Sequence, residues 1–584
     1  MNELKHINKY FKKYRYRLLL GILITVGAKI FALFTPRYIG KAITTISRHV
    51  KGDISETVFR EELALHIGYL IGAAIIAGVF TFLMRQTIIN VSRFIEYDLK
   101  NEIYKQYQNL SLNFYKANKT GDLMNRISED VDKVRMYAGP AIMYTINTVT
   151  LFVVALIYML SVSPKLTLYT VLPLPFLSFI IYKLSRVINT RSRVVQEYLS
   201  HLSAYTQESF SGISVIKSYN IESRNFNEFS MLSEDSKQKQ INLTKVQALF
   251  FPSMILLIGV SNILVAYIGG MQYMNGEIKD IGTIAEFLIY VNMLTWPVAT
   301  VGWVTNLVQQ AEASQKRINH FLQEEPEIKN LSNTPVTIKG DITFKDVTYI
   351  YPDTNIKALD RVSFSISKGE TLAILGKTGS GKSTILDLIG RLYEVQDGEV
   401  LIDNTPIDQI HLKSLRDHIG YVPQDAFLFS DTIENNIMFG KEDATEHEVI
   451  NAAKKADVHK NIVKFTKGYK TKLGERGVTL SGGQKQRVSI ARAIIKSPEI
   501  MLFDDCLSAV DTATEEKILN SLREVSKGKT TIIVSHRISS AKDADLIIVL
   551  EDGKIIQKGH HQTLVNIDGY YKDLYTKQLS TKEL

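Results

Sequence analysis

The pattern of apolar and polar positions changes at about residue 325. Before it, six apolar stretches alternate with charged segments, and each is long enough to cross the hydrocarbon core of a bilayer. They cover residues 18–38, 63–84, 138–162, 166–186, 248–272 and 284–310. After it, short apolar runs alternate with amphipathic stretches, which is typical of an α/β domain. We therefore expect a transmembrane domain over 1–324, a linker over 325–337 and an α/β domain over 338–584.

The basic residues predict the orientation of the expected spans. Segments 1–17, 85–135 and 183–245 contain six, nine and nine Lys or Arg residues, whereas 46–62, 163–165 and 271–286 contain three, one and one. Cytoplasmic loops carry the excess of Lys and Arg. Both termini and the α/β domain are therefore expected in the cytoplasm, with the chain in the cell membrane. The first 17 residues are expected to form an interfacial helix and not a cleaved signal peptide.

Two of the basic segments are expected to be long helical arms. Residues 85–135 and 183–245 have apolar positions at helical spacing and few Gly or Pro. Each has one break near its middle, at 118–122 and around 211–212 respectively. The two hairpins would project well beyond the bilayer and could dock on a partner surface below it.

Composition narrows the alternatives. The formal net charge is +9, but the basic residues follow the expected cytoplasmic segments, so we expect no nucleic-acid partner. Cys506 is the single cysteine, which excludes an intramolecular disulfide and a multi-cysteine zinc site. It follows an apolar strand, and a packing role is expected for it.

A phosphate-binding loop follows an apolar strand at 372–375. Its residues, Gly376 to Ser383 in the order GKTGSGKS, match the P-loop pattern in a strand–loop–helix context. The glycines allow backbone N–H groups to approach phosphate oxygens. Lys382 is expected to hold the β- and γ-phosphates of ATP, and Ser383 to bind Mg²⁺.

Two more strands end in groups suited to the same chemistry. The strand 500–503 leads to Asp504, a Walker-B carboxylate for the Mg²⁺ shell, and Asp505 follows where a hydrolytic base could reach water. The strand 531–534 leads to Ser535 and His536. We expect His536 to be functional, because it ends a strand of this series.

With these motifs, the chain resembles the ATP-binding cassette family over essentially its whole length. The most specific element is the signature Leu480-Ser481-Gly482-Gly483-Gln484. The order of motifs is also that of the family. They are Tyr351-Pro352, the P-loop, Gln424, Gly474-Glu475-Arg476-Gly477, the signature, Asp504, Ser508-Ala509-Val510-Asp511 and His536. The first half resembles the branch of lipid flippases and multidrug exporters, whose coupling helices the segments 113–126 and 208–219 match.

The resemblance implies roles for individual residues. Tyr351 would stack on adenine, and Gln424 would sense Mg²⁺ with Ser383 and Asp504. Asp505, His536 and Gln424 would be the catalytic set. Ser481, Gly483 and Gln484 would contact the nucleotide held by a second cassette, since two cassettes close head to tail in this family. The remaining expected nucleotide contacts are Gly376, Thr378, Gly379, Ser380, Gly381, Lys382, Thr384 and Asp511.

One residue departs from the family pattern and leaves the partner open. Most active members have Glu where this chain has Asp505. The shorter side chain withdraws the carboxylate, and such a misplacement can slow a reaction by ~100-fold. Either a homodimer hydrolyses ATP slowly, or the chain is the weak-site subunit of a heterodimer whose partner supplies Glu; we favour the heterodimer.

We expect the chain to fold into an α-helical six-span transmembrane domain with long intracellular helices, followed by an α/β P-loop NTPase domain. Its expected function is ATP-driven export, or leaflet flipping, of an amphipathic, lipid-like or drug-like cargo. An ATP-gated channel or a regulatory subunit on the same scaffold is the alternative. Lys29 lies within the first span, where a charge is costly unless it faces a cavity or a partner. It is expected to face a cargo cavity or to form an interhelical or headgroup contact.

Overall fold

The computed structural model describes residues 3–474, 480–506 and 512–580. The chain forms two compact units. The helical unit comprises Met1–Tyr107 and Gly121–Gln323, and the C-terminal unit comprises Glu324–Leu584 together with the short segment Gln108–Thr120. This segment, which joins two helices of the first unit, therefore packs with the second.

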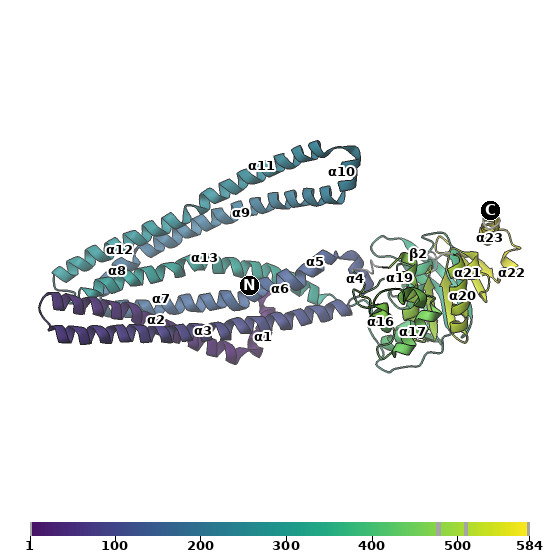
Figure 1. The fold of residues 1–584 in the computed structure, drawn as a ribbon, viewed down its shortest axis with the longest axis horizontal. Helices are drawn as coiled ribbons and strands as arrows, with labels where there is room; N and C mark the ends of the chain where they lie inside the picture. The colour runs from purple at the N-terminus through teal and green to yellow at the C-terminus, as the bar shows by residue number, and fades with distance from the viewer. Residues whose placement is uncertain (1–2, 475–479, 507–511, 581–584) are drawn as a thin grey trace. The chain divides into compact units, whose positions relative to one another are not determined.

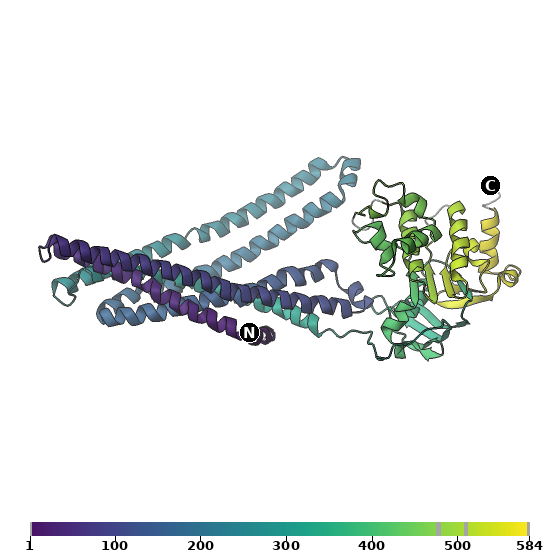
Figure 2. The same cartoon turned by 60° about the horizontal axis from the view of Figure 1, so that its bottom comes forward.

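Long helices make up the helical unit (Figures 1 and 2). In chain order they are α1 (Asn8–Lys13), α2 (Arg15–Val50), α3 (Glu56–Asn109), α5 (Thr120–Asn125), α6 (Val131–Met136), α7 (Ile142–Val162), α8 (Pro164–Val171), α9 (Pro173–Ser211), α10 (Ile213–Tyr219), α11 (Glu222–Gln247), α12 (Phe250–Met274) and α13 (Gly282–Gln323). A 3₁₀ helix, η1 (Glu3–Ile7), precedes α1, and the π-helical turns η2 (Arg126–Asp130) and η3 (Tyr137–Ala141) flank α6. The short α4 (Leu112–Ala117) belongs to the segment that packs with the C-terminal unit.

Five helical stretches of the described residues are long and apolar enough to cross a membrane. They are Arg15–Val50, Glu56–Asn109, Thr120–Val162, Glu222–Met274 and Gly282–Gln323. Each overlaps one expected span. The remaining expected span, 166–186, falls across α8 and α9, which are separated at Leu172. Pro173 starts the new helix there, because proline lacks the N–H that a continuous helix would need.

The basic segment 183–245 forms a long helical hairpin. Helices α9 and α11 lie side by side and are joined at their far end by α10 (Figure 1). The hydroxyl of Tyr205 on α9 donates to the backbone oxygen of Asn225 on α11 at 3.1 Å. Gly212 starts the cross-piece, and Asn220 ends it in the left-handed conformation. The break predicted around 211–212 therefore lies at the turn of this hairpin.

Ion pairs fix the first residues of the chain to α3. Lys9 Nζ donates to Glu102 Oε1 at 2.6 Å, and Lys13 Nζ donates to Asp98 Oδ2 at 2.7 Å. Burial raises the pKa of Glu102, but hydrogen bonds from His6, Lys9 and Tyr10 outweigh it and bring the pKa to about 2. Lys9 and Lys13 of α1 are thus bound by carboxylates of α3.

Two sheets form the C-terminal unit. The antiparallel sheet has the order β2-β1-β4-β5, and the six-stranded sheet has the order β10-β9-β3-β8-β7-β6. The strands are β1 (Ile342–Ile350), β2 (Lys357–Ile366), β3 (Thr371–Gly376), β4 (Asp397–Ile402), β5 (Thr405–Pro406), β6 (Ile419–Val422), β7 (Ile500–Asp504), β8 (Thr530–Val534), β9 (Leu546–Glu551) and β10 (Lys554–Gly559). All neighbouring pairs from β9 to β6 are parallel. Their side chains read as continuous apolar runs because helices cover both faces.

Helices complete the C-terminal unit around the six-stranded sheet. They are α14 (Lys382–Ile389), α15 (Leu412–Asp417), α16 (Ile433–Met438), α17 (Glu446–Lys455), α18 (His459–Ile462), α19 (Gly482–Ile495), α20 (Thr512–Ser526), α21 (Ile538–Ala541), α22 (His561–Leu564) and α23 (Tyr570–Ser580). One apolar core lies between β1, β2, β4 and the central strands, and a second joins α16, α17 and α19 to β7. The second core holds α19 against the strand that ends at Asp504.

Two glycines allow α2 and α13 to approach each other closely. A Cβ added to Gly282 would lie 1.8 Å from the backbone oxygen of Gly40. Because backbone atoms cannot move aside singly, Gly282→Ala should push the helices apart and destabilise the helical unit by about 1–3 kcal/mol. Thermal unfolding of the purified protein in detergent would measure the loss.

Gly270→Ala is the matched control, because a Cβ on Gly270 of α12 meets no atom within 4 Å. It should leave the unfolding temperature unchanged or raise it slightly, since alanine favours helix over glycine. Equal unfolding temperatures for the two variants would contradict the close approach of α2 and α13.

Candidate nucleotide-binding site

The P-loop lies between β3 and α14, as the sequence predicts. Gly376, Gly379 and Gly381 all have positive φ, at 149°, 81° and 97°. A Cβ at Gly376 would lie 2.2 Å from the oxygen of Leu550, and one at Gly381 would lie 2.1 Å from that of Ala358. Glycine is therefore required at both positions for conformation and for space.

The side chains of the loop converge on a site suited to phosphate. Lys382 is buried, and its Nζ donates to the backbone oxygens of Gly376 at 3.0 Å and Lys377 at 2.7 Å. Ser380 is buried too, and its Oγ has no hydrogen-bond partner among the described residues. An unsatisfied buried hydroxyl and a lysine bonded to carbonyl groups fit an anion that would replace these contacts. Thr378 and Gly379 are exposed at the mouth of the loop.

The parallel register brings the other predicted groups to this edge of the sheet. Asp504 pairs with Val534, and Val534 pairs with Ile374, so β7, β8 and β3 end together. The Ser383 hydroxyl donates to Asp504 Oδ1 at 3.0 Å. This hydroxyl and carboxylate are hard oxygen donors of the kind that hold Mg²⁺ with substrate phosphates. The residues therefore fit the metal, and Gln424 lies just beyond β6 on the same edge, with an exposed side chain.

Burial and neighbouring charges shift the pKa values of Asp504 and His536 at this edge. Burial raises the pKa of Asp504, and neighbouring Asp505 adds to the rise, while the Ser383 hydrogen bond and Lys382 oppose it. Burial and Lys382 lower the pKa of His536, and the two aspartates oppose that shift. The His536 imidazole is therefore mainly neutral at pH 7, with one ring nitrogen as a hydrogen-bond donor and the other as an acceptor.

Asp505 lies at the end of β7 with its backbone in the left-handed region, at φ 43°. Its N–H donates to the oxygen of Val534 at 3.0 Å, and the residue is only 9% exposed.

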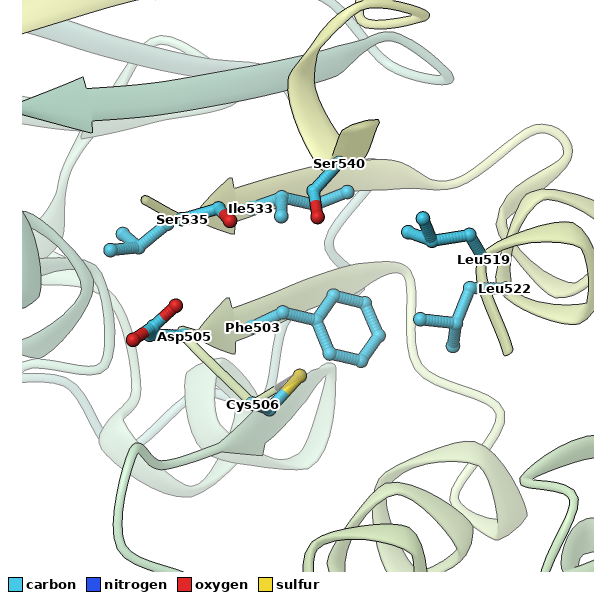
Figure 3. Close-up of a pocket in the computed structure, with 9 residues that line it drawn as sticks. Phe503, Asp505, Cys506, Leu519, Leu522, Ile533, Ser535 and Ser540 are labelled. Carbon is cyan, nitrogen blue, oxygen red and sulfur yellow. The ribbon is translucent and has the colours of Figure 1, made fainter. Parts of the chain in front are cut away.

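Figure 3 shows Asp505 beside Ser535, at the opposite end of a small gap from Leu519 and Leu522. The gap has a volume of about 10 Å³, which is no more than a single water requires, so it is a packing defect and not a ligand site. Burial raises the pKa of Cys506 in its wall, so this thiol stays protonated.

Tyr351 lies beside the first turn of the P-loop helix α14. Its hydroxyl and that of Thr384 are 3.0 Å apart. The rings of Tyr349 and Tyr393 contact it nearly at right angles, with centroids 5.1 and 5.7 Å away. An aromatic side chain next to the P-loop thus stands where the resemblance implies an adenine platform.

The signature residues occupy a separate place. Ser481 caps α19, and its side chain and that of Gln484 form reciprocal bonds with the backbone, which orders the first turn containing Gly483. Within the described part of the chain, no hydrogen bond or ion pair joins Ser481, Gly483 or Gln484 to the P-loop. Glu475–Gly477 and Ser508–Asp511, including the predicted contact Asp511, lie outside the described residues.

The structure adds residues that the motifs did not identify. Gln486 Nε2 donates to the backbone oxygen of Gln424, and the Gln578 amide bonds to the backbone of both His536 and Ile538. Burial raises the pKa of Asp387 on α14 to about 6, with a contribution from Asp504, while Lys116 opposes the rise. A helical count from Ser383 places Asp387 one turn further on, but the other contacts have no signal in sequence spacing.

Comparison with known proteins identifies this combination of units. The family model described as ABC transporter transmembrane region matches residues 18–298, and that described as ABC transporter matches residues 359–508. The "Multidrug resistance-like ATP-binding protein MdlA" of Escherichia coli K12 is 33% identical over 99% of this chain and 97% of its own length. The "Probable multidrug resistance ABC transporter ATP-binding/permease protein YheI" of Bacillus subtilis 168 is 34% identical, over 98% and 97%.

A solved structure agrees with both units. It is described as a "bacterial Atm1-family ABC exporter with ATP bound", and it aligns with a TM-score of 0.79 and 27% identity over 97% of this chain and 98% of its own. Apolar helices joined on one chain to an ATP-binding α/β unit define a membrane-embedded exporter driven by ATP hydrolysis. The chain belongs to the ABC transporter family.

Asp387 provides a test of the electrostatics around α14. Its native pKa, about 6, lies above that of an ordinary carboxyl, so the folded state binds the proton more tightly than the unfolded state. The stability that this proton contributes is present at low pH and is lost as the pH rises towards 6. Asp387→Asn should therefore stabilise the protein at pH 7.5, by roughly 1–2 kcal/mol after solvent screening, and clearly less at pH 4.5.

Thermal unfolding at both pH values would measure this difference. Asp443→Asn, at an exposed position, is the control and should change stability equally at the two pH values. An Asp387→Asn effect that does not depend on pH would show that the carboxyl is ionised throughout.

Proposed function

We propose that the chain is a half-transporter of the cell membrane that exports an amphipathic, lipid-like or drug-like compound. The observation that carries this proposal is that the described residues contain both the P-loop edge with Ser383 and Asp504 and five apolar helical stretches of membrane length. The two relatives are named for multidrug resistance, which supports the cargo class. The excess of Lys and Arg in segments 1–17, 85–135 and 183–245 supports a cytoplasmic ATPase unit and cytoplasmic termini.

The proposed roles follow the geometry of the edge. Ser380, Lys382 and the backbone N–H groups of the loop would hold the phosphates of ATP, and Tyr351 would stack on its base. Ser383, Asp504 and Gln424 would hold Mg²⁺, which would neutralise phosphate charge. Asp505 would accept a proton from the attacking water, and neutral His536 would stabilise the γ-phosphate by a hydrogen bond.

A second cassette is part of the proposal, because no hydrogen bond or ion pair in the described part of the chain joins the signature residues to their own P-loop. ABC exporters of this kind function as dimers. The start of α19 has ordered N–H groups and the positive end of a 14-residue helix dipole, which suit a phosphate brought by another chain. Ser481, Gly483 and Gln484, with Asp511, would thus complete the partner's site.

The α9–α11 hairpin supports the same conclusion. At its tip, Phe210, Tyr219 and Phe226 are 71%, 75% and 69% exposed. Large aromatic side chains that are exposed together indicate an interaction surface more often than a hairpin tip that contacts only water. We infer that this tip docks on an ATPase unit and transmits its closure to the helices.

The favoured partner is a different subunit that has Glu after its Walker-B aspartate. The motifs among the described residues are otherwise intact, so the signature of this chain could serve a competent partner site. A homodimer would have Asp505 at both sites. Within the described residues, Lys29 on α2 is half-buried and has no hydrogen-bond or ion-pair partner, so it is our candidate for contact with an anionic or amphipathic cargo.

Asp505→Glu tests the weak-site assignment. The added methylene should bring the carboxylate within reach of the attacking water and raise the ATPase rate of the chain expressed alone by at least ten-fold. Steady-state phosphate release from purified dimers would measure this increase. Asp505→Asn, of the same size without the proton acceptor, should lower the residual rate. Robust hydrolysis by the parent protein that Asp505→Glu does not increase would rule out a weak site.

Transport by membrane vesicles distinguishes an exporter from a channel. Inverted vesicles that contain the chain and its partner should accumulate a labelled amphiphile against its gradient only when ATP is added. The Lys382→Met variant, which lacks the phosphate-binding ammonium, should accumulate none. ATP-dependent equilibration that stops when the concentrations are equal would instead indicate an ATP-gated channel.

A further inference from the structure

Lys116 of α4 lies over two aromatic rings of the C-terminal unit. Its Nζ is 4.5 Å from the ring centre of Tyr351 and 4.8 Å from that of Tyr393. Both distances are within the range of cation–π attraction. The segment that carries Lys116, Gln108–Thr120, packs as part of this unit although it links helices of the other one.

Independent hydrogen bonds hold the segment in this position. Ser111 Oγ donates to Glu327 Oε2 at 2.9 Å, and Asn113 Nδ2 donates to both Glu327 oxygens at 2.9 and 2.8 Å. Glu327 belongs to the stretch that leads into β1. Lys116 is thus positioned by anchors near its own helix, and not by the aromatic rings alone.

The ring of Tyr351 is also the proposed adenine platform. Its hydroxyl is already bonded to Thr384 on the P-loop helix, and two rings contact it at right angles. A flat base needs an open face of the ring to stack on, and the Lys116 ammonium occupies such a face. The ammonium and the base therefore compete for one π surface.

We propose that Lys116 is a placeholder in the adenine site that ATP displaces, so that base binding releases α4 from Tyr351. The proposal rests on the assignment of Tyr351 as the adenine platform. It makes the Gln108–Thr120 segment a sensor of the base, in addition to any sensing of phosphate at the other end of the site. By linkage, the factor by which Lys116 weakens ATP binding is the factor by which ATP weakens the Lys116 contact.

Lys116→Ala tests the competition directly. Loss of a cation would by simple electrostatics weaken the binding of an anion, so tighter binding would be diagnostic. The full-length chain with Lys116→Ala should bind a non-hydrolysable ATP analogue about two- to five-fold more tightly, as expected for the loss of an exposed cation–π contact. Its affinity for inorganic tripolyphosphate, which has no base, should stay the same or fall. Equilibrium binding with labelled ligand would measure both.

Lys119→Ala is the matched control, because Lys119 is exposed in the same segment and has no hydrogen bond or ion pair with the described residues. It should bind both ligands as the parent protein does. Equal or weaker analogue binding by Lys116→Ala would overturn the proposal, and so would tighter binding of both ligands. Failure of the parent protein to bind the analogue would overturn the ATP-site assignment itself.

Amine labelling gives a readout that does not involve hydrolysis. Addition of the ATP analogue should increase the modification of Lys116 by an acylating reagent, measured by mass spectrometry, relative to that of Lys119. Tripolyphosphate should produce no such increase. Protection of Lys116 by the analogue would show that this lysine contacts the nucleotide and would contradict displacement.

Discussion

The parallel register of β3, β8 and β7 is the constraint on which the site depends. Because Ile374, Val534 and Asp504 are in register, the chain leaves all three strands at one edge. The Ser383–Asp504 hydrogen bond then fixes the P-loop helix to the end of β7. Groups more than a hundred residues apart in sequence meet there, and the apolar strands below them exclude water. Without this register, the P-loop would be a phosphate-binding turn that lacks a metal ligand and a base.

The helical unit follows a different constraint, because its outward side chains face lipid. Leu23, Ile75 and Ile263 are 69%, 62% and 68% exposed within the unit, which would be costly in water. Inside the unit, close backbone approach adds to the packing of a buried apolar core. Gly40 and Gly282 show this, since Gly282 N–H donates to Thr44 Oγ1 at 3.2 Å where the helices meet.

Sequence patterns predicted most of the fold and the phosphate end of the site, because each rests on local chemistry. A P-loop needs its glycines at fixed positions, and Asp504 and His536 follow apolar strands that can be recognised individually. The break at Leu172 between α8 and α9 was less evident, since the prolines there fall within an apolar run. Lys116 and Asp387 could not be found at all, because their environments come from segments distant in sequence. A lysine in a basic loop has no pattern that reveals an aromatic ring over two hundred residues away.

The two ends of the proposed nucleotide site therefore depend on different parts of the transporter. Under the proposed assignment, Asp505 and the Ser481–Gln484 signature at the phosphate end would depend on a second cassette. The identity of that cassette would then affect turnover more than the binding of ATP to this chain. At the base end, Tyr351 and Lys116 belong to the same chain, so the proposed competition would operate before any partner closes. ATP would then act in two steps. It would first release α4 from Tyr351 within this chain, and it would then bring in the second cassette that hydrolysis requires.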